Sequence, residues 1–489
     1  MAGSQVVQSV DRMLGSRSLA TLLAATAGER PGYRALAQGV RTLLLDGRIT
    51  LHTRLPAERD LAGALGVSRA TVTAAYDLLR EGGFAQSRRG SGTWTLLPEG
   101  QRPTSVAAFP AGDDVIDLAL AAPYAPQAEL AAALRAAGGM LTELAASPGY
   151  HPYGIPELRA AVAERFTRRG LPTLPDQILI TSGAQHAVSL TLGLLGKSGD
   201  RVLVENPSYP NGLDAIRGAG LRTAPVPVTA DGWDSDLIES TLRQTAPRLA
   251  YMIPDFHNPT GAVMPAEQRR RLLDAVRRTG TWLIIDETLS DIALDAAPPA
   301  PFASLAQHGE AEQVVTVGSL SKTHWGGLRI GWVRAGSRLI TELTQRRVTL
   351  DMAGSVLDQL VALHLMKDMD TVLAERLPRL RAQRDALAAA LARHLPEWRW
   401  ELPAGGLSLW VDLGRPMATA LARAALDHGV RIEGGARFGA DPGTYEHRLR
   451  IPFTLPAEVC EEAARRLATA LSTDLPASAL APRQPHWVA

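Results

Sequence analysis

Lys322 is the residue best suited to covalent chemistry, because it is one of only three lysines among 489 residues, beside Lys197 and Lys367. It ends the run GSLSK, directly after the apolar residues 314–317, which predict a strand. A lysine at a strand exit among small hydroxyl residues can be partly desolvated, which lowers the pKa of the amine and leaves it nucleophilic. The pattern therefore suits a Schiff-base lysine, although an ordinary surface lysine fits it too. Lys197 in a Gly/Ser loop and Lys367 on a polar helix are typical of solvated surface.

Two further polar residues follow other predicted strands. Asp286 ends the apolar run 282–285, and a carboxylate at a buried strand end needs a cationic partner. A protonated pyridine nitrogen would be such a partner, and the pairing would keep the ring an electron sink. Capping of the following segment is the other explanation. Asn258, in the run NPTG after residues 249–253, carries an amide that can donate to a phenolic oxygen.

Three more motifs fit a ligand with a phosphate and an aromatic ring. The run Gly-Ala-Gln at 183–185 lies between the predicted strand 177–180 and a helix, where free backbone N–H groups bind phosphate well. Arg329, seven residues after the lysine, can pair with a phosphate as a fork. Tyr209, in the run NPSYP, can stack on a ring. Each motif is ordinary alone, and their order along the chain is the informative signal.

Elements that would position these residues begin at about residue 115. Short apolar runs alternate with amphipathic helices, which predicts an α/β body with a mostly parallel sheet. A long Arg/Leu/Ala helix at 376–395 and strands at 407–413 and 449–453 predict a smaller α+β lobe. Residues 98–114 lack periodicity and hold three prolines and two glycines, so we expect a linker there.

The first hundred residues predict a different module. Apolar stripes predict helices at 33–47, 56–65 and 69–83, and the tight turn Gly66-Val67 joins the last two as a helix-turn-helix. Strands at 84–88 and 93–97 predict a β-hairpin, or wing. The third helix would present to the major groove Ser68, Arg69, Thr71 and Thr73. Expected at the DNA backbone are Arg54, Arg59, Arg88 and Arg89, with Gly90 and Gly92 allowing close approach of the wing. A helical cap with a solvated arginine face is the alternative.

Composition limits the class of protein. A hydrophobic fraction of 46% and a charged fraction of 21% exclude a disordered or fibrous chain. We expect a cytoplasmic protein without a secretory signal or membrane span, since no apolar run approaches about 18 residues. The single Cys460 excludes an internal disulfide and a cysteine-cluster metal site, and no metal is predicted. Residues 1–100 carry a net charge of +4 and the remainder −3, which fits an anionic partner at the N-terminal end or simply a soluble surface.

The N-terminal module is similar to a known family. The run LPAERDLAGALGVSRATVTAAYDLLREGGFAQSRRGSGTWT resembles the GntR-type winged helix-turn-helix, over about residues 33–97. Ala75-Tyr76 is typical of the MocR branch, which joins this module to a body resembling a fold-type I aminotransferase. The resemblance implies a multidomain chain: a winged helix-turn-helix at 30–97, a linker at 98–114, and a pyridoxal-phosphate-binding and dimerisation domain at 115–475.

The ordered motifs of the body resemble the aminotransferase class I/II pattern over about residues 116–470. The resemblance implies pyridoxal 5′-phosphate held as an internal aldimine by Lys322, with Asp286 at the pyridine nitrogen and Asn258 at the phenolic oxygen. Residues implied around the rest of the cofactor are Gly183, Ala184, Gln185, Tyr209, Ser319, Ser321 and Arg329. Tyr150 is similar to the tyrosine that reaches the partner subunit's phosphate, and Arg450 resembles the arginine that binds a substrate or effector carboxylate.

Two departures from the family pattern affect the expected function. The run Asp-Glu-Thr-Leu at 286–289 lacks the tyrosine that often contacts the phenolic oxygen, so catalytic tuning is in doubt. Pro210-Asn211 follows Tyr209, whereas GABA-responsive members carry an arginine near this point, so a GABA-type double clamp is not expected.

Three hypotheses follow from these patterns. The leading one is a homodimeric regulator of the MocR/GntR type, whose body binds pyridoxal phosphate and a small amine or B6-vitamer effector to control operator binding. The second is an active aminotransferase with an accessory DNA-binding domain. The third is a DNA-binding protein with a purely structural body.

Overall fold

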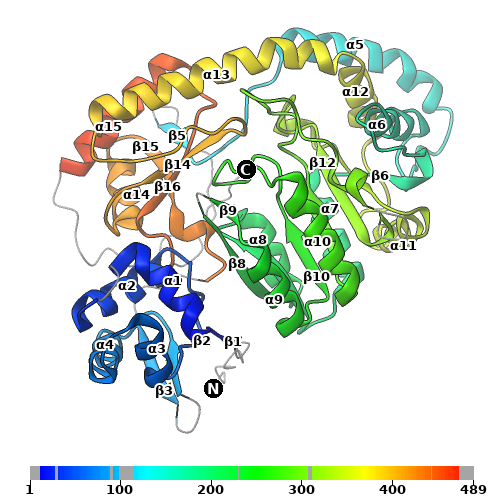
Figure 1. Cartoon of the computed structure of the whole chain (residues 1–489). Coiled ribbons are helices and arrows are strands. Elements are labelled where there is room, and N and C mark those ends of the chain that lie inside the picture. The colour runs from blue at the N-terminus through cyan, green and yellow to red at the C-terminus, as the bar shows by residue number, and fades with distance from the viewer. Residues whose placement is uncertain are drawn as a thin grey trace, which may run out of the picture.

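The computed structural model describes residues 12–27, 31–88, 92–98, 115–229, 231–306, 311–441 and 443–472. Figure 1 shows a small N-terminal head, a large α/β domain and a C-terminal lobe. None of the helices in these residues is long and apolar enough to cross a membrane. Short 3₁₀ turns occupy Pro175–Gln177, Phe302–Leu305, Ala311–Gln313, Gly326–Leu328 and Gly435–Phe438.

The head contains the predicted helix-turn-helix and wing. Its helices are α2 (Tyr33–Leu45), α3 (Glu58–Leu65) and α4 (Arg69–Glu81), and its strands are β1 (Arg12–Met13), β2 (Thr53–Arg54), β3 (Ala85–Arg88) and β4 (Gly92–Thr95). Helix α3 ends at Gly66, whose φ of 64° lies in the left-handed region that glycine adopts without strain. Ser68 then caps α4 by accepting the N–H of Thr71 at 3.1 Å.

Two elements of the head lie before the predicted boundary at residue 30. Helix α1 (Ser16–Ala27) places Leu19 and Leu23 in the hydrophobic core of the head. Strand β1 pairs with β2 in parallel, so the sheet has the order β1-β2-β4-β3. The head in this structure therefore includes residues 12–27 as well as the helix-turn-helix.

The large domain is built on an eight-stranded sheet, as the alternating pattern predicted. Its strands, in spatial order, are β6 (Ile178–Thr181), β13 (Gly331–Arg334), β12 (Val314–Ser319), β11 (Trp282–Asp286), β10 (Leu249–Met252), β7 (Arg201–Asn206), β8 (Arg222–Thr229) and β9 (Gly232–Trp233). Strands β12, β11, β10, β7 and β8 pair in parallel, whereas β13 and β9 are antiparallel to their neighbours.

Helices cover both faces of this sheet. They are α5 (Gln127–Leu144), α6 (Pro156–Arg168), α7 (Ala184–Leu195), α8 (Pro210–Gly218), α9 (Ser235–Thr245), α10 (Ala266–Thr279), α11 (Ser337–Val348) and α12 (Val356–Lys367). Alternate residues of one strand belong to different hydrophobic clusters: Leu283 and Ile285 pack in one, and Ile284 in the other. Because both faces of the sheet are buried, its strands are the continuous apolar runs seen in the sequence.

The C-terminal lobe also contains the segment that follows the predicted linker. It comprises α13 (Met369–His394), β14 (Ser408–Asp412), α14 (Ala418–Asp427), β15 (Val430–Gly434), β16 (Arg448–Pro452), α15 (Ala457–Ser472) and β5 (Ile116–Leu118). Strand β5 pairs in parallel with β15 at the edge of the sheet β14-β16-β15-β5. The chain thus enters the body through its C-terminal lobe before it forms the large domain.

The head contacts the C-terminal lobe, beneath which it lies in Figure 1. The N–H of Tyr445 donates to the carbonyl oxygen of Leu45, the last residue of α2, at 2.7 Å. His447 Nε2 lies 3.0 Å from Asp46 Oδ1. Burial raises the pKa of Asp46 and lowers the pKa of His447. These contacts form a small polar junction, which we call the head–lobe junction.

Candidate functional site

The large domain holds a cavity of about 190 Å³ at the carboxyl ends of its central parallel strands. Asp286 ends β11, while Asn258 and Lys322 follow β10 and β12, so neighbouring strands bring these distant residues together. Predicted cofactor residues that line the cavity are Ala184, Gln185, Tyr209, Asn258, Asp286, Ser321, Lys322 and Arg329.

Lys322 lies partly buried in the turn after β12. Its Nζ donates to the carbonyl oxygen of Ala121 at 3.0 Å. Burial lowers the pKa of Lys322 to about 7; the positive charges of Arg450 and Arg329 act in the same direction, and Asp286 opposes them. An amine with this pKa is largely uncharged just above neutral pH, so it is a competent nucleophile there.

Asp286 is 4% exposed, and its hydrogen-bond donors are neutral. Tyr251 donates its hydroxyl to Oδ2 at 2.9 Å, and Thr288 donates its N–H and hydroxyl to Oδ1 at 3.0 and 2.7 Å. Burial raises the pKa of Asp286, and the hydrogen bonds from Thr288 and Tyr251 and the charge of Lys322 partly offset this. A buried carboxylate with this surrounding is suited to a cationic ring nitrogen.

The start of α7 forms a cradle with Arg329. Gly183 has a φ of 83°, and a Cβ placed on it would lie 2.6 Å from Arg329 Nη2. Arg329 Nη2 donates to the carbonyl oxygen of Ser182 at 2.8 Å. Glycine is therefore required at 183, both for the turn and for the close approach of the guanidinium. The free N–H groups of the helix and the guanidinium together suit a phosphate.

The other wall of the cavity carries amide and phenol groups. Tyr209 OH accepts a hydrogen bond from Asn211 Nδ2 at 2.8 Å, and burial raises the pKa of Tyr209 to about 12. Gln185 Nε2 donates to the carbonyl oxygen of Asn211 at 2.9 Å. The buried Oδ1 of Asn258 has no hydrogen-bond partner within the described ranges. The amide oxygen of Asn258 is thus available to a ligand in the cavity.

Four predicted residues lie outside the cavity lining: Gly183, described above, and Ser319, Tyr150 and Arg450. Ser319 supports the lysine loop from behind, donating to the carbonyl oxygen of Ile330 at 2.9 Å and accepting the N–H of Ser321 at 3.1 Å. Tyr150 is 65% exposed on the surface, where a second subunit could contact it. Arg450 is fully buried and donates to the carbonyl oxygen of Ala119.

Arg450 is surrounded by the strands of the C-terminal lobe. Its guanidinium carbon lies 5.1 Å from the ring centroid of Phe438, and its Cα partner across β15 and β16 is Glu433. Burial lowers the pKa of Arg450 to about 10 and raises that of Glu433 to about 7. Arg450 thus acts on the cavity as a nearby positive charge, one that lowers the pKa of Lys322.

Several residues of the site were not identified from the sequence. Tyr251 and Thr288 hold Asp286, and the carbonyl oxygens of Ala119 and Ala121 receive the hydrogen bonds of Arg450 and Lys322. We call residues 119–122, which include both carbonyls, the wall segment. Ala121 and Ala122 line the cavity, and the wall segment directly follows β5. Across the described ranges, no group of three His, Cys, Asp or Glu residues is placed to hold a metal ion.

The predicted DNA-contact residues lie around the start of α4. Arg54, Arg59, Ser68 and Arg69 are exposed, and Thr71 and Thr73 are half-buried. Arg89, Gly90 and the side chain of Arg88 fall outside the described residues. A Cβ on Gly92 would lie 3.0 Å from Arg54 Nε, so the arginine lies across the base of the wing.

Glu58, a residue not predicted to act here, orients the start of this helix. It accepts the hydroxyl of Thr73 at 2.8 Å and lies 3.5 Å from Arg69 Nε. The side chain of Arg69 is nevertheless 72% exposed. Arg69 therefore remains available for a base edge, whereas the hydroxyls of Ser68 and Thr73 already serve the helix itself.

Two family models match the chain. The model for aminotransferase class I and II matches residues 114–467, and the model for bacterial regulatory proteins of the gntR family matches residues 32–94. The probable rhizopine catabolism regulatory protein MocR of Rhizobium meliloti is 30% identical, over 75% of this chain and 78% of its own. The uncharacterized HTH-type transcriptional regulator YisV of Bacillus subtilis is 29% identical, over 78% of this chain and 84% of its own.

Enzymes are similar to the body. A 2-aminoadipate transaminase of Thermus thermophilus is 33% identical, over 77% of this chain and 92% of its own. The crystal structure of LysN, an α-aminoadipate aminotransferase of Thermus thermophilus complexed with N-(5′-phosphopyridoxyl)-L-leucine, superposes with a TM-score of 0.68. It is 32% identical and covers 73% of this chain and 92% of its own.

Proposed function

Since the chain belongs to the aminotransferase class I and II family and carries a gntR-type winged helix-turn-helix, we propose that it is a MocR-type transcription regulator that binds pyridoxal 5′-phosphate. The observation that carries this proposal is the meeting of Lys322, Asp286 and Asn258 in one cavity of a chain with a DNA-binding head.

The residues of the cavity fit the cofactor by their chemistry. Asp286 is a buried carboxylate with neutral hydrogen-bond donors, the buried amide oxygen of Asn258 has no partner in the described part of the chain, and Gly183 lets the guanidinium of Arg329 approach the start of α7 where a Cβ would block it. Asp286 would keep a proton on the ring nitrogen, and Lys322 would hold the cofactor covalently. Arg329, Ala184, Gln185 and Ser321 would contact the phosphate. When bound, the cofactor supplies an aldehyde that condenses with amines.

The effector in this proposal is a small amino compound or a B6 vitamer. An amine would compete with Lys322 for the aldehyde, and a carboxylate on that amine would be drawn toward Arg450. Asn211 follows Tyr209 in the cavity wall and carries no charge, so this wall offers no second cationic clamp. We therefore expect effectors with at most one carboxylate.

Occupancy of the cavity would be transmitted through the wall segment. The carbonyl oxygens of Ala119 and Ala121 accept hydrogen bonds from Arg450 and Lys322, the two basic side chains that the effector and the cofactor would engage. The segment continues β5, which follows the predicted linker to the head. A ligand shifts the position of the head only if it favours one arrangement over another. When Lys322 and Arg450 engage the cofactor and the effector, they would give up these two hydrogen bonds to the wall segment. Loss of the two bonds would supply such a preference.

Two copies of the chain would bind paired half-sites. Tyr150 would reach the partner's phosphate, and the apolar residues Leu350 and Met352, which are exposed in the single chain, would suit contact with a second copy. In each head Arg69 would read a base edge, Ser68, Thr71 and Thr73 would support the contact, and Arg54 and Arg59 would bind phosphates.

The proposal is tested by operator binding of the full chain with and without pyridoxal phosphate, followed by titration with candidate amines. We expect a visible absorption band from the bound cofactor and a change in operator affinity when an effector is added. Absence of DNA binding in either state would overturn the regulator assignment, and a protein that stays colourless with added cofactor would overturn the sensing mechanism.

An active aminotransferase is the second candidate. The 33% identity to a 2-aminoadipate transaminase and the lowered pKa of Lys322 favour it. Steady multiple-turnover transamination of an amino acid and keto acid pair would support it. A single half-reaction, or none, would support a regulator with at most residual chemistry.

A further inference from the structure

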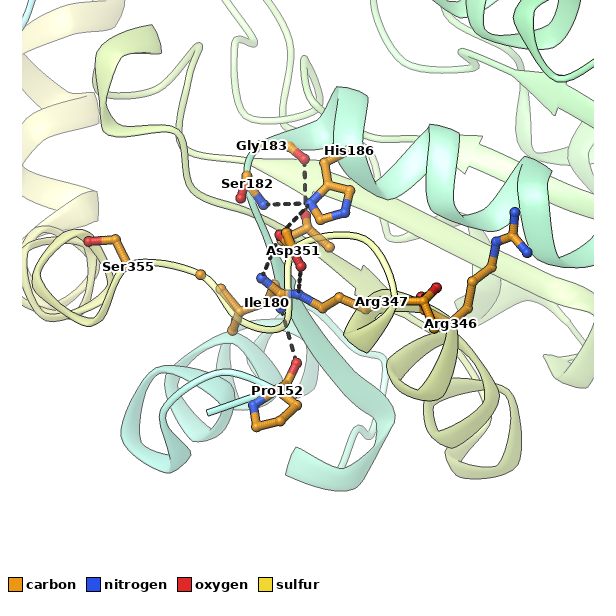
Figure 2. A network of polar contacts seen from close by, with 12 residues as sticks. Pro152, Ile180, Ser182, Gly183, His186, Arg346, Arg347, Asp351 and Ser355 are labelled. Atoms are coloured by element: carbon orange, nitrogen blue, oxygen red, sulfur yellow. Dashed lines mark hydrogen bonds and ion pairs between the residues drawn. The ribbon is translucent and has the colours of Figure 1, made fainter. Parts of the chain in front are cut away.

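The turn that precedes α7 is held by a buried arginine that no motif indicated (Figure 2). Arg347, near the end of α11, is 1% exposed and donates Nη1 to the carbonyl oxygen of Ile180 and, at 3.1 Å, to that of Pro152. Its Nε and Nη2 bind the two carboxylate oxygens of Asp351 at 2.8 and 3.3 Å. A two-point contact of this kind fixes the orientation of both groups.

A histidine on α7 completes the arrangement. His186 Nδ1 accepts the N–H of Ser182 at 3.2 Å, and it lies 3.6 Å from Asp351 Oδ2. The contact resembles a capping box, because a side chain in the first turn of the helix reaches back to a backbone N–H that precedes it. Ser182 is thus fixed at its N–H by His186 and at its carbonyl oxygen by Arg329.

The hydrogen bond to Ser182 requires a neutral imidazole with its proton on Nε2, since a protonated Nδ1 cannot accept. The charged groups that face His186 are Asp351, Arg347 and Arg329. Burial lowers the pKa of His186, the two arginines lower it further, and Asp351 raises it. Acidification would place a proton on Nδ1, turn it toward Asp351 and release the N–H of Ser182.

We infer that Arg347, Asp351 and His186 are positioning residues for the cofactor's phosphate, which they serve by fixing the turn Ser182–Gly183. None of the three lines the cavity. They act through the turn, whose geometry sets the direction of the free N–H groups at the start of α7. The inference rests on the proposed function, because it assigns the phosphate of pyridoxal phosphate to this turn.

The test compares two ligands that differ only in the phosphate, pyridoxal 5′-phosphate and pyridoxal, with the full-length protein. Loss of the hydrogen bond in His186→Leu should weaken pyridoxal phosphate binding about tenfold and leave pyridoxal binding unchanged. His186→Asn, whose Oδ1 can replace Nδ1 as acceptor, should restore the wild-type preference for the phosphorylated ligand. A merely structural role would change both affinities together.

The pH profile supplies a second readout. The wild-type preference for pyridoxal phosphate should fall with acid below the ordinary histidine pKa of about 6.5, while His186→Asn lacks this loss. Asp351→Asn should move the loss to lower pH, because Asp351 raises the pKa of His186. Glu342→Gln is the matched control, because it lies on α11, the helix of Arg347, and breaks only an exposed pair with Arg338. This variant should behave as the wild type.

The outcomes separate the inference from the proposed function. If the wild type binds pyridoxal phosphate and His186→Leu keeps its full preference over pyridoxal, the positioning role is wrong while the cofactor assignment stands. If the wild type binds neither ligand, the proposed function itself fails. Should His186→Leu not fold, the wild-type, His186→Asn and Asp351→Asn pH profiles decide the matter, and identical profiles for all three overturn the inference.

Discussion

Two arginines, one in the head and one in the body, differ sharply in their exposure to solvent. Arg69 at the start of α4 has a side chain that is 72% exposed, whereas Arg450 beside the cavity is fully buried. In the head, the side chain of Arg69 lies largely in water, where its charge is screened from all but its neighbour Glu58. In the body, burial couples the groups, so that Arg450 and Asp286 change the pKa of Lys322 in opposite directions. Substitutions should therefore have local effects in the head and distributed effects in the body.

The largest effect is expected in the body. Lys322→Ala removes the amine that would hold the cofactor, so the visible absorption band of the loaded protein should disappear. Lys367→Ala, which changes one of the other two lysines, should leave the band intact. Absorbance spectra of both variants, recorded after loading with pyridoxal phosphate and removal of the unbound cofactor, measure the band. A coloured Lys322→Ala protein would show that the proposed attachment site is wrong.

The next effect separates the two regions. Arg69→Ala should weaken operator binding by about 1–3 kcal/mol, or about 5- to 150-fold, without changing the affinity for pyridoxal phosphate. Arg338→Ala, another exposed arginine, is the control. Operator titrations and cofactor titrations on the same samples test the separation. A parallel loss of cofactor affinity would contradict independent behaviour of the head.

A smaller effect concerns pH. Because the pKa of Lys322 is lowered to about 7, the neutral amine increases as pH rises through 7. The rate of cofactor capture should rise about tenfold per pH unit below 7 and level off above it. In Arg450→Gln, loss of a positive neighbour should move the midpoint to higher pH. Stopped-flow absorbance between pH 5.5 and 9 measures the rate, and a wild-type rate still rising at pH 9 would contradict the lowered pKa.

The smallest effect should occur at the head–lobe junction. Asp46→Asn weakens the polar contact with His447, whose imidazole has a pKa lowered by burial, and a hydrogen bond of this kind contributes about 1 kcal/mol. We expect the ratio of operator affinities with and without pyridoxal phosphate to move toward one by at most about fivefold. Asp77→Asn, which affects an exposed pair within the head, is the control. An unchanged ratio would show that the junction does not couple the regions.

The elements of the head were predictable because its helices carry regular apolar stripes. Val72, Ala75, Tyr76 and Leu79 of α4 are all buried, as their spacing requires. Helix α1 was missed because it buries Leu19 and Leu23 fully but Ala20 and Leu22 only in part, and it is otherwise rich in alanine, serine and threonine. A short, weakly apolar helix is stabilised by packing that the sequence alone does not display.

The cavity was predictable only in part. Motifs at strand ends identified Lys322, Asp286 and Asn258, because parallel strands end at one edge of the sheet. Tyr251 was missed because its contact depends on strand register: it pairs with Ile284, which places Asp286 two residues further on the same face. The hydrogen bonds to the wall segment were missed for another reason, since a backbone carbonyl has no sequence signature.

Strand β5 has three residues and lies at the edge of its sheet. Its detachment would expose the buried Leu118 and break the ion pair between Asp117 and Arg431, so it needs a ligand that favours the detached state. Detachment of residues 116–118 from the sheet would lengthen the connection between head and body by about 10 Å. Successive half-sites on a duplex are about 34 Å apart, so this change is nearly a third of their spacing. A change in the bonding of the Lys322 amine would then alter the distance between the half-sites that the two heads of a dimer can bind.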